Sequence, residues 1–212
     1  MWMQKYISSA YETNTYCLIS EKNNAVIIDP AEIDMGVIRE LNEKGAVIRK
    51  ILLTHGHFDH TKSCAEIVRM TGAKVFVHAS DEAKLADIDL AMGSKLDKKN
   101  FEPILKYQVV TEGDIIEIDE FRFYVMHTPG HTAGSVIYRF KDILFTGDTI
   151  FKETIGATND RSSDLQALFN SVERIKALDC DFQILPGHGP ETTLYYEKKN
   201  NFYFTNNWLI VD

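Results

Sequence analysis

Alternating apolar and polar residues mark the strands in the first third of the chain. Residues 15–20 and 25–29 are rich in β-branched side chains and are bounded by polar turns, which predicts two strands. A pair of asparagines lies between them and predicts a hairpin. Residues 47–54 and 74–78 predict two further strands, and the first of these ends in an apolar run that indicates burial on both faces.

Apolar residues recur at helical spacing in three segments. The first two predicted helices span residues 33–44 and 60–70, and a glycine follows each of them as the expected C-cap. The third predicted helix spans residues 165–178, with Ser163 or Asp164 as its N-cap.

Strands return in the second half of the chain, over residues 115–118, 121–127, 135–140, 143–146 and 182–185. Residues 81–107 are helical in part and polar in part, and we interpret them as an excursion that forms either a lid over a site or part of the core. No Pro-rich or Ser-rich linker and no internal repeat divides the chain. We therefore predict one domain over residues 1–212.

The composition is that of an ordinary globular protein with an acidic surplus. Hydrophobic residues make up 44% of the 212 residues and charged residues 25%, so a sizeable core is expected. Asp and Glu number 31 against 23 Lys and Arg, and the net charge of −8 disfavours a nucleic acid or an anionic membrane as a partner. No apolar run reaches the ~20 residues that span a bilayer.

Two further features bear on the compartment. The first ten residues lack the basic start and the apolar run of a signal peptide. Three widely spaced cysteines, Cys17, Cys64 and Cys180, form no disulfide framework. Both features favour the reducing cytoplasm.

Three of the seven histidines fall within one short segment. His55, His57 and His60, together with Asp59, lie between the apolar strand 47–54 and the predicted helix that follows it. A loop between a strand and a helix is where α/β proteins place their sites. Neutral imidazole and carboxylate groups suit zinc, iron or manganese, so the segment predicts a metal site.

The same composition recurs at three later strand ends. His131 follows the strand 121–127, Asp148 follows the strand 143–146, and His188 comes shortly after the last predicted strand. Each lies on a turn that contains glycine, which lets the backbone approach a cluster closely. Four strand ends that carry metal-binding residues indicate one rim of a sheet sandwich.

These motifs give the chain a clear resemblance to the metallo-β-lactamase superfamily, whose fold is a four-layer αβ/βα sandwich. The resemblance implies two divalent metal ions. It implies that the first site comprises His55, His57 and His131, that the second comprises Asp59, His60 and His188, and that Asp148 bridges the two. Asp59 is further implied to orient the hydroxide that bridges the metals and attacks the substrate. Zinc is the expected metal, with iron or manganese as alternatives.

Within the superfamily, the segments THGHFDH, HTPGHTAGS, FTGDT and PGHGPET are most similar to the glyoxalase II-like hydrolases. That resemblance implies hydrolysis of an acyl-thiol substrate such as S-lactoylglutathione to a hydroxy acid and a thiol. The sequence is compatible with either a monomer or a homodimer. The best-known β-lactamase subclass carries cysteine where this chain has Asp148, which argues against β-lactam hydrolysis.

The chain also departs from the glyoxalase II pattern. Ala157 stands where a basic residue that contacts glutathione is expected, and Pro190 stands where the full-length enzymes place a tyrosine. Only 24 residues follow His188, so we do not expect their C-terminal helical domain. The identity of the thiol therefore stays open.

Three other functions compete with thioester hydrolysis. The first is a persulfide dioxygenase-like enzyme with one iron on His55, His131 and Asp148, and the second is a lactone or other ester hydrolase of the same fold. The third is a binding module stabilised by metal, which the large donor set disfavours because structural zinc sites are closed and four-coordinate. Asp29, at the end of a strand, either orients a ligand histidine or caps the turn.

Overall fold

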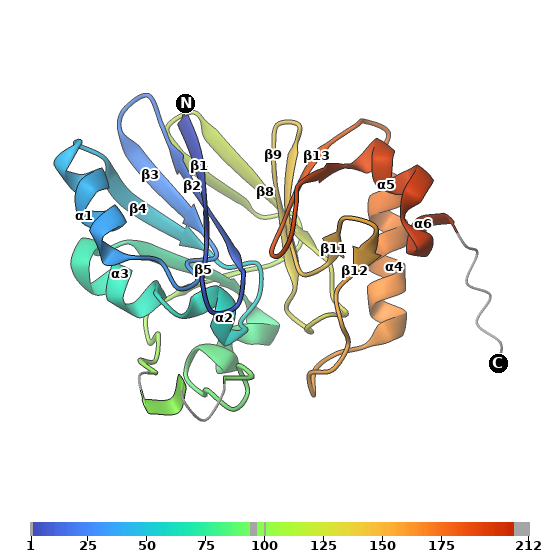
Figure 1. Cartoon of the computed structure of the whole chain (residues 1–212), viewed down its shortest axis with the longest axis horizontal. Helices are drawn as coiled ribbons and strands as arrows, with labels where there is room; N and C mark the ends of the chain where they lie inside the picture. The colour runs from blue at the N-terminus through green and yellow to red at the C-terminus, as the bar shows by residue number, and fades with distance from the viewer. Residues whose placement is uncertain (1, 94–96, 100, 206–212) are drawn as a thin grey trace.

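Two six-stranded sheets lie face to face in the computed structural model, which describes residues 2–93, 97–99 and 101–205 (Figure 1). The first sheet has the strand order β1 (Trp2–Ile7), β2 (Asn14–Ile19), β3 (Asn24–Ile28), β4 (Val47–Leu52), β5 (Lys74–His78), β6 (Gln108–Val110). The second has the order β14 (Thr192–Thr193), β13 (Gln183–Pro186), β10 (Ile143–Gly147), β9 (Val136–Phe140), β8 (Phe121–His127), β7 (Ile115–Ile118). A small ribbon, β11 (Ile150–Phe151) and β12 (Thr154–Ile155), stands apart from both sheets.

Each sheet combines antiparallel and parallel pairing. In the first sheet β1, β2 and β3 are antiparallel, whereas β3 to β6 run parallel. In the second sheet β7 to β10 form an antiparallel meander, and β13 returns parallel to β10. The parallel pairs matter for the site because parallel strands bring their carboxyl ends to the same edge of a sheet.

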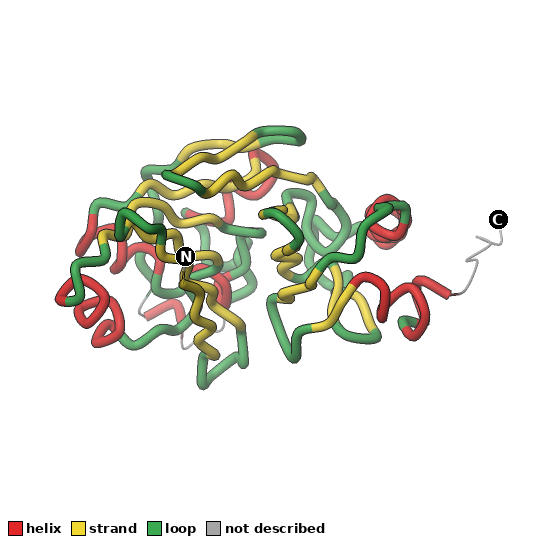
Figure 2. The backbone as a smooth tube through the Cα atoms, turned by 90° about the horizontal axis from the view of Figure 1, so that it is seen from above, coloured by secondary structure: helices red, strands yellow, loops and turns green. Residues whose placement is uncertain are grey.

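Helices cover the outer face of each sheet (Figure 2). The α-helices are α1 (Met35–Glu43), α2 (Phe58–Thr61), α3 (Cys64–Thr71), α4 (Leu165–Lys176), α5 (Leu194–Asn200) and α6 (Phe202–Thr205). Apolar residues of α1 and α3 pack on the first sheet, and those of α4, α5 and α6 pack on the second. The layers run helix, sheet, sheet, helix, which confirms the predicted αβ/βα sandwich.

The shared core lies between the two sheets and is strongly aromatic. Phe121 and Phe123 point inward from alternate positions of β8 and meet Phe140 and Phe145, with ring centroids 5.3 to 6.4 Å apart. All four rings are fully buried. A second core lies between the first sheet and its helices, and β3 contributes to both. Val26 faces the second sheet, while its neighbours in β3 face the outer helices. This dense packing gives the loops at the sheet edge a rigid base.

Most strands lie where the alternation predicts them, but one predicted helix is divided into two, with its predicted glycine cap confirmed at Gly72. Residues 60–70 form the end of α2 and a separate helix α3. The break falls at Ser63, whose backbone N–H donates to the carbonyl of Pro30 at 3.0 Å. This hydrogen bond to a distant residue replaces one within the helix, so the series of helical hydrogen bonds is interrupted. At α4 the predicted cap is confirmed, because the Asp164 carboxylate accepts from the Ala167 N–H at 2.9 Å.

The excursion predicted over residues 81–107 begins with η1 (Ala79–Leu85), a stretch of 3₁₀-helix, and includes the short η2 (Asp97–Lys99). Leu85 and Ile104 are buried in the outer core of the first sheet, so part of the excursion is packing. Met92 is half exposed and lies beside the predicted metal ligands. Residues 94–96 and 100 of this segment lie outside the described residues.

Two buried tyrosines join the sheets at the edge that carries the predicted ligands. The Tyr16 hydroxyl on β2 donates to the carbonyl of Pro186 at 2.8 Å, and the Tyr138 hydroxyl on β9 donates to the carbonyl of Leu53 at 2.9 Å. The first of these hydrogen bonds is donated from the first sheet to the second, and the other from the second sheet to the first. Burial raises the pKa of both phenols, so both remain donors at neutral pH.

We expect Tyr138→Phe to lower the free energy of unfolding by about 1–2 kcal/mol, because the buried Leu53 carbonyl loses its partner. Urea denaturation followed by tryptophan fluorescence measures the change. Tyr124→Phe is the matched control, since Tyr124 lies on β8 and is only partly buried. An equal loss in both variants would contradict the role assigned to the Tyr138 hydroxyl.

Candidate metal centre

Four loops meet at one edge of the sheets, between α2 and the β11–β12 ribbon (Figure 1). The loop after β4 leads into α2 and carries the histidine cluster. The loops after β8, β10 and β13 bring His131, Asp148 and His188 to the same place. All seven residues predicted from the sequence therefore lie together, although they span more than half of the chain.

Three imidazole nitrogens converge at the first predicted site. The Nδ1 atom of His57 lies 3.1 Å from Nε2 of His55 and 3.0 Å from Nε2 of His131. A tetrahedral zinc ion with bonds of ~2.0–2.1 Å holds its donor atoms about 3.3 Å apart. The spacing of these nitrogens is therefore the spacing that one ion requires.

The second group combines a carboxylate with two imidazoles. The Nε2 atoms of His60 and His188 are 3.3 Å apart, and Oδ2 of Asp59 lies 3.5 Å from the first and 3.2 Å from the second. His60 is fully buried, whereas Asp59 and His188 are partly accessible. This site is thus the more open of the two.

Asp148 lies between the two groups. Its Oδ1 is 3.2 Å from Nε2 of His60, while its Oδ2 is 3.5 Å from Nε2 of His131 and 3.6 Å from that of His188. Oδ1 is buried and has no hydrogen-bond partner among the described residues. A buried carboxylate oxygen without a donor is costly unless a cation meets it. This orphaned atom, together with the nitrogen and oxygen donors around it, fits a pair of divalent ions.

Electrostatics keep three of the donors in the forms that bind metal. Burial, reinforced by neighbouring imidazoles, lowers the pKa of His55 and His131, so both rings are neutral at physiological pH. Burial alone would raise the pKa of Asp148, but the surrounding histidines, His60 foremost, outweigh it and lower that pKa. Neutral imidazoles and an ionised carboxylate are the species that coordinate zinc. At His60 and His188 burial would lower the pKa, but the neighbouring carboxylates outweigh it and raise that pKa, so these two rings must release a proton when a metal binds.

Asp29 supports two of the histidines from behind. Its Oδ2 lies 3.0 Å from Nδ1 of His60, and the carboxylate accepts from both the N–H and the hydroxyl of Thr54, at 2.7 and 2.6 Å. The Thr54 hydroxyl is in turn 3.1 Å from Nδ1 of His55. The sequence left the role of Asp29 open between orienting a ligand and capping a turn, and these contacts favour orientation.

Asp81 is a supporting residue that the sequence analysis missed. It is fully buried, and its carboxylate accepts from the N–H of Gly56, the N–H of Gly134 and the hydroxyl of Thr132. These partners flank His55, His57 and His131 in two loops. No signal identified it, because it lies in the excursion at a position typical of a solvated helix start.

The loops approach so closely that side chains are excluded at two glycines. A Cβ atom on Gly187 would lie 2.2 Å from Oδ1 of Asp148 and 2.6 Å from Cε1 of His60. A Cβ atom on Gly156 would lie 1.8 Å from the carbonyl oxygen of Asp148. The glycines that the sequence places beside the ligands thus serve close approach, as expected.

Two histidines outside the cluster are packed against each other. His78 and His127 stack with ring centroids 4.0 Å apart and an interplanar angle of 11°. Nε2 of His127 lies 2.9 Å from the carbonyl of Ala133, and neither ring belongs to the convergent groups. Both are therefore structural.

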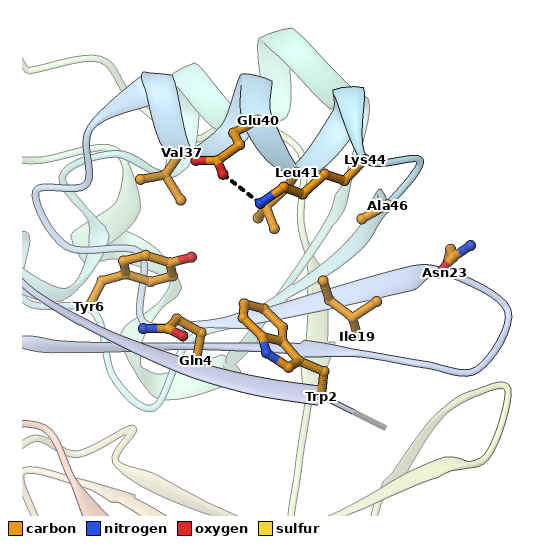
Figure 3. Close-up of a pocket in the computed structure, with 10 residues that line it drawn as sticks. All are labelled: Trp2, Gln4, Tyr6, Ile19, Asn23, Val37, Glu40, Leu41, Lys44 and Ala46. Atoms are coloured by element: carbon orange, nitrogen blue, oxygen red, sulfur yellow. Dashed lines mark hydrogen bonds and ion pairs between the residues drawn. The ribbon is translucent and has the colours of Figure 1, made fainter.

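A pocket of about 360 Å³ opens over the cluster. Apolar side chains form much of its wall, namely Tyr11, Phe58, Met92 and Phe151, and Ala157 and Asn159 complete the rim. A larger groove of about 550 Å³ lies elsewhere, between α1 and β1 (Figure 3). That groove contains none of the seven predicted ligands, so the chemistry of the donors, and not volume, identifies the site.

Within the part of the chain that the structure describes, no helix combines the length and the apolar character needed to cross a membrane.

Comparison with known proteins agrees with this geometry. A family model described as the metallo-beta-lactamase superfamily matches residues 10–188. An uncharacterized protein of Mycobacterium tuberculosis is 34% identical over 203 residues, which cover 89% of this chain and 91% of that protein. The hydroxyacylglutathione hydrolase GloC of Haemophilus influenzae is 29% identical over 197 residues, which cover 91% of this chain and 93% of GloC. The crystal structure of BLEG-1 B3 metallo-beta-lactamase has a TM-score of 0.89 at 31% identity and covers 97% of this chain and 100% of that one.

The division into two groups predicts distinct metal losses. His188→Ala removes one donor of the second group and leaves the first intact, so zinc-loaded protein should fall from two equivalents per chain to a single one. Elemental analysis after gel filtration measures the ratio. His78→Ala, which removes a stacked histidine outside the groups, should retain both equivalents. Two full equivalents in the His188 variant would refute the division.

Proposed function

The chain belongs to the metallo-β-lactamase superfamily and is a metal-dependent hydrolase; from that premise we propose that it hydrolyses acyl thioesters of the glyoxalase II type. The observation that supports this proposal most directly is the pair of donor groups beneath an open pocket, with Asp148 between them and within 3.6 Å of nitrogens from both. Seven donors for two ions leave coordination positions for water and substrate, as catalytic sites require.

We assign His55, His57 and His131 to the first ion, Asp59, His60 and His188 to the second, and Asp148 to both. When bound, the ions supply Lewis acidity and lower the pKa of water toward neutrality. We propose zinc as the metal, and the same nitrogen and oxygen donors also accept iron or manganese.

Asp59 is the residue that we propose orients the attacking water. Its Oδ2 accepts from the hydroxyl of Thr13 at 3.2 Å and lies beside the nitrogens of His60 and His188. Burial would raise the pKa of Asp59, but the two histidines outweigh it and lower that pKa, so the carboxylate is an acceptor at neutral pH. A fixed acceptor at this place holds a hydroxyl hydrogen and turns the oxygen toward the substrate.

The pocket favours a small acyl group joined to a larger thiol. Its volume of about 360 Å³ accommodates a short hydroxyacyl chain, and Tyr11, Phe58 and Phe151 offer apolar surface for a thiol chain. A thiolate leaves readily because the thiol pKa is only ~8.5, which removes the need for a strong acid near the leaving group. The likeness to GloC supports the same substrate class.

The cellular setting forms part of the same proposal. The three cysteines are free, which suits a reducing cytoplasm. The proposed partner is a small acyl thiol rather than a nucleic acid or a membrane, as the acidic charge balance indicates.

β-Lactam hydrolysis is a second candidate, because BLEG-1, a B3 metallo-beta-lactamase, is 31% identical and covers nearly the whole chain. Asp148 argues only against the subclass that carries cysteine at that position. The persulfide dioxygenase-like alternative would use one iron and consume oxygen. Each of these two alternative activities can be assayed separately from thioester hydrolysis.

Steady-state hydrolysis of S-lactoylglutathione by zinc-loaded protein tests the proposal. We expect kcat/KM of ~10⁴ M⁻¹s⁻¹ or more, complete loss with a chelator and recovery with zinc. Asp59→Asn should lower kcat at least about 100-fold and reduce zinc occupancy of the second site, because the change affects both a ligand and the acceptor for the attacking water. A chromogenic cephalosporin and a glutathione persulfide with iron-loaded protein serve as competing substrates. Faster turnover of either one, or of a simple lactone, would overturn thioester hydrolysis as the function.

The position of Ala157 yields a prediction about thiol recognition. Its side chain is exposed at the rim of the pocket, and only its carbonyl contributes to the site, 2.7 Å from Nδ1 of His131. Ala157→Arg should therefore leave kcat unchanged and lower KM for S-lactoylglutathione by roughly tenfold through a bond to a substrate carboxylate. Ala157→Leu is the control for bulk, and an equal fall in KM in both variants would exclude a charge effect.

A further inference from the structure

His57 faces the metal centre differently from its two neighbours. It presents Nδ1 to the cluster, whereas His55 and His131 present Nε2. The remaining nitrogen, Nε2 of His57, lies 3.2 Å from Oδ2 of Asp160. A histidine that is free to rotate offers either nitrogen to a metal, so something must select Nδ1 here.

We propose that the buried Lys84–Asp160 pair is a positioning device for the first metal site, which fixes the orientation and tautomer of His57. The inference rests on the proposed metal centre and concerns how that centre is held. Asp160 accepts the proton on Nε2 of His57, which leaves the Nδ1 lone pair for the ion. Asp160 and Lys84 are positioning residues, because neither touches the cluster except through His57.

The surroundings of Asp160 hold its carboxylate in place. Oδ2 accepts from Nζ of Lys84 at 2.5 Å and from the hydroxyl of Ser162 at 2.8 Å. The side chains of Lys84 and Asp160 are only 6% and 5% exposed. Burial would raise the pKa of Asp160, but the hydrogen bonds from His57, Lys84 and Ser162 outweigh it and lower that pKa, so the carboxylate is an acceptor toward His57.

Lys84 is itself fixed by three segments. Its stem packs against the loop of the histidine cluster so closely that a Cβ atom on Gly56 would lie 2.8 Å from its Cβ. Its ammonium also donates to the hydroxyl of Ser162 at 3.1 Å and toward the carbonyl of Leu90 at 3.4 Å. The pair therefore joins the excursion, the loop after β12 and the ligand His57 at one point.

A contribution to folding stability alone does not explain why a buried ion pair is present here. A buried ion pair contributes little compared with apolar side chains of similar volume, whereas loss of one partner is costly because it strands a charge. The informative variants therefore change both residues together. In Lys84→Met/Asp160→Leu the pair is replaced by apolar side chains and His57 loses its acceptor. In Lys84→Met/Asp160→Asn an amide oxygen still accepts from His57 and no ammonium opposes the amide N–H groups.

The test is zinc affinity of the apoprotein, measured by competition with a chromophoric chelator. We expect Lys84→Met/Asp160→Leu to bind one of its two zinc equivalents, the one held by His57, about 10–100-fold more weakly than the wild type, with a melting temperature within a few degrees. Lys84→Met/Asp160→Asn should recover most of the lost affinity. The visible spectrum of the Co²⁺-loaded protein should change in the Leu variant and return toward the wild type in the Asn variant.

The matched control is Lys62→Met/Glu32→Gln. This pair also joins a lysine to a carboxylate, at 2.7 Å, and begins two residues after His60, but it contacts no predicted ligand. Its zinc affinity should equal that of the wild type.

Two failures are distinguishable. If the wild type binds fewer than two zinc ions, the proposed centre itself is wrong. If the wild type binds two, and the Leu and Asn double variants bind zinc equally well or lose the same affinity, the pair does not position His57 and the inference is overturned.

Discussion

The buried carboxylate of Asp148 is the constraint on which the site depends. It lies within 3.6 Å of nitrogens from His60, His131 and His188, which come from three different loops. One of its oxygens has no donor among the described residues. Without a bound cation this arrangement does not contribute to the stability of the fold. Packing elsewhere in the protein must therefore hold these groups together.

The packing of the two sheets, away from the site, supplies this stabilisation. The aromatic core around Phe123 and Phe145 fixes the sheets against each other, and the hydroxyls of Tyr16 and Tyr138 lock the edge where the loops emerge. The loops are then joined to one another by buried carboxylates. Asp29 connects the end of β3 to the first histidine loop, and Asp81 connects that loop to the loop of His131. Each support is a polar group satisfied by several donors, which makes the loops rigid without a large local core.

The sequence predicted which residues come together at this edge because they lie in glycine-containing loops that follow apolar strands. Strand alternation is a local signal, and β5, β7 and β8 have the bounds that it predicts. The missed strands are β1, β6, β11, β12 and β14, since an edge strand with few buried positions and strands of two or three residues carry little alternation. The break between α2 and α3 depends on the bond from Ser63 to Pro30, a contact between residues far apart in the chain. Asp81, Lys84 and Asp160 were missed for the same reason, because their roles arise only from long-range contacts.

The loop over residues 156–160 contacts the metal-binding residues and also forms part of the pocket rim. Gly156 must be small because it presses on the backbone of Asp148, Ala157 offers its carbonyl to His131, and Asp160 offers its carboxylate to His57. Backbone and inward-facing groups of this loop thus serve the metal ligands. The exposed side chains of Ala157 and Asn159 do not support the metal ligands and lie at the pocket rim. Side chains at these two positions can therefore change the pocket rim without removing a contact to the metal-binding residues.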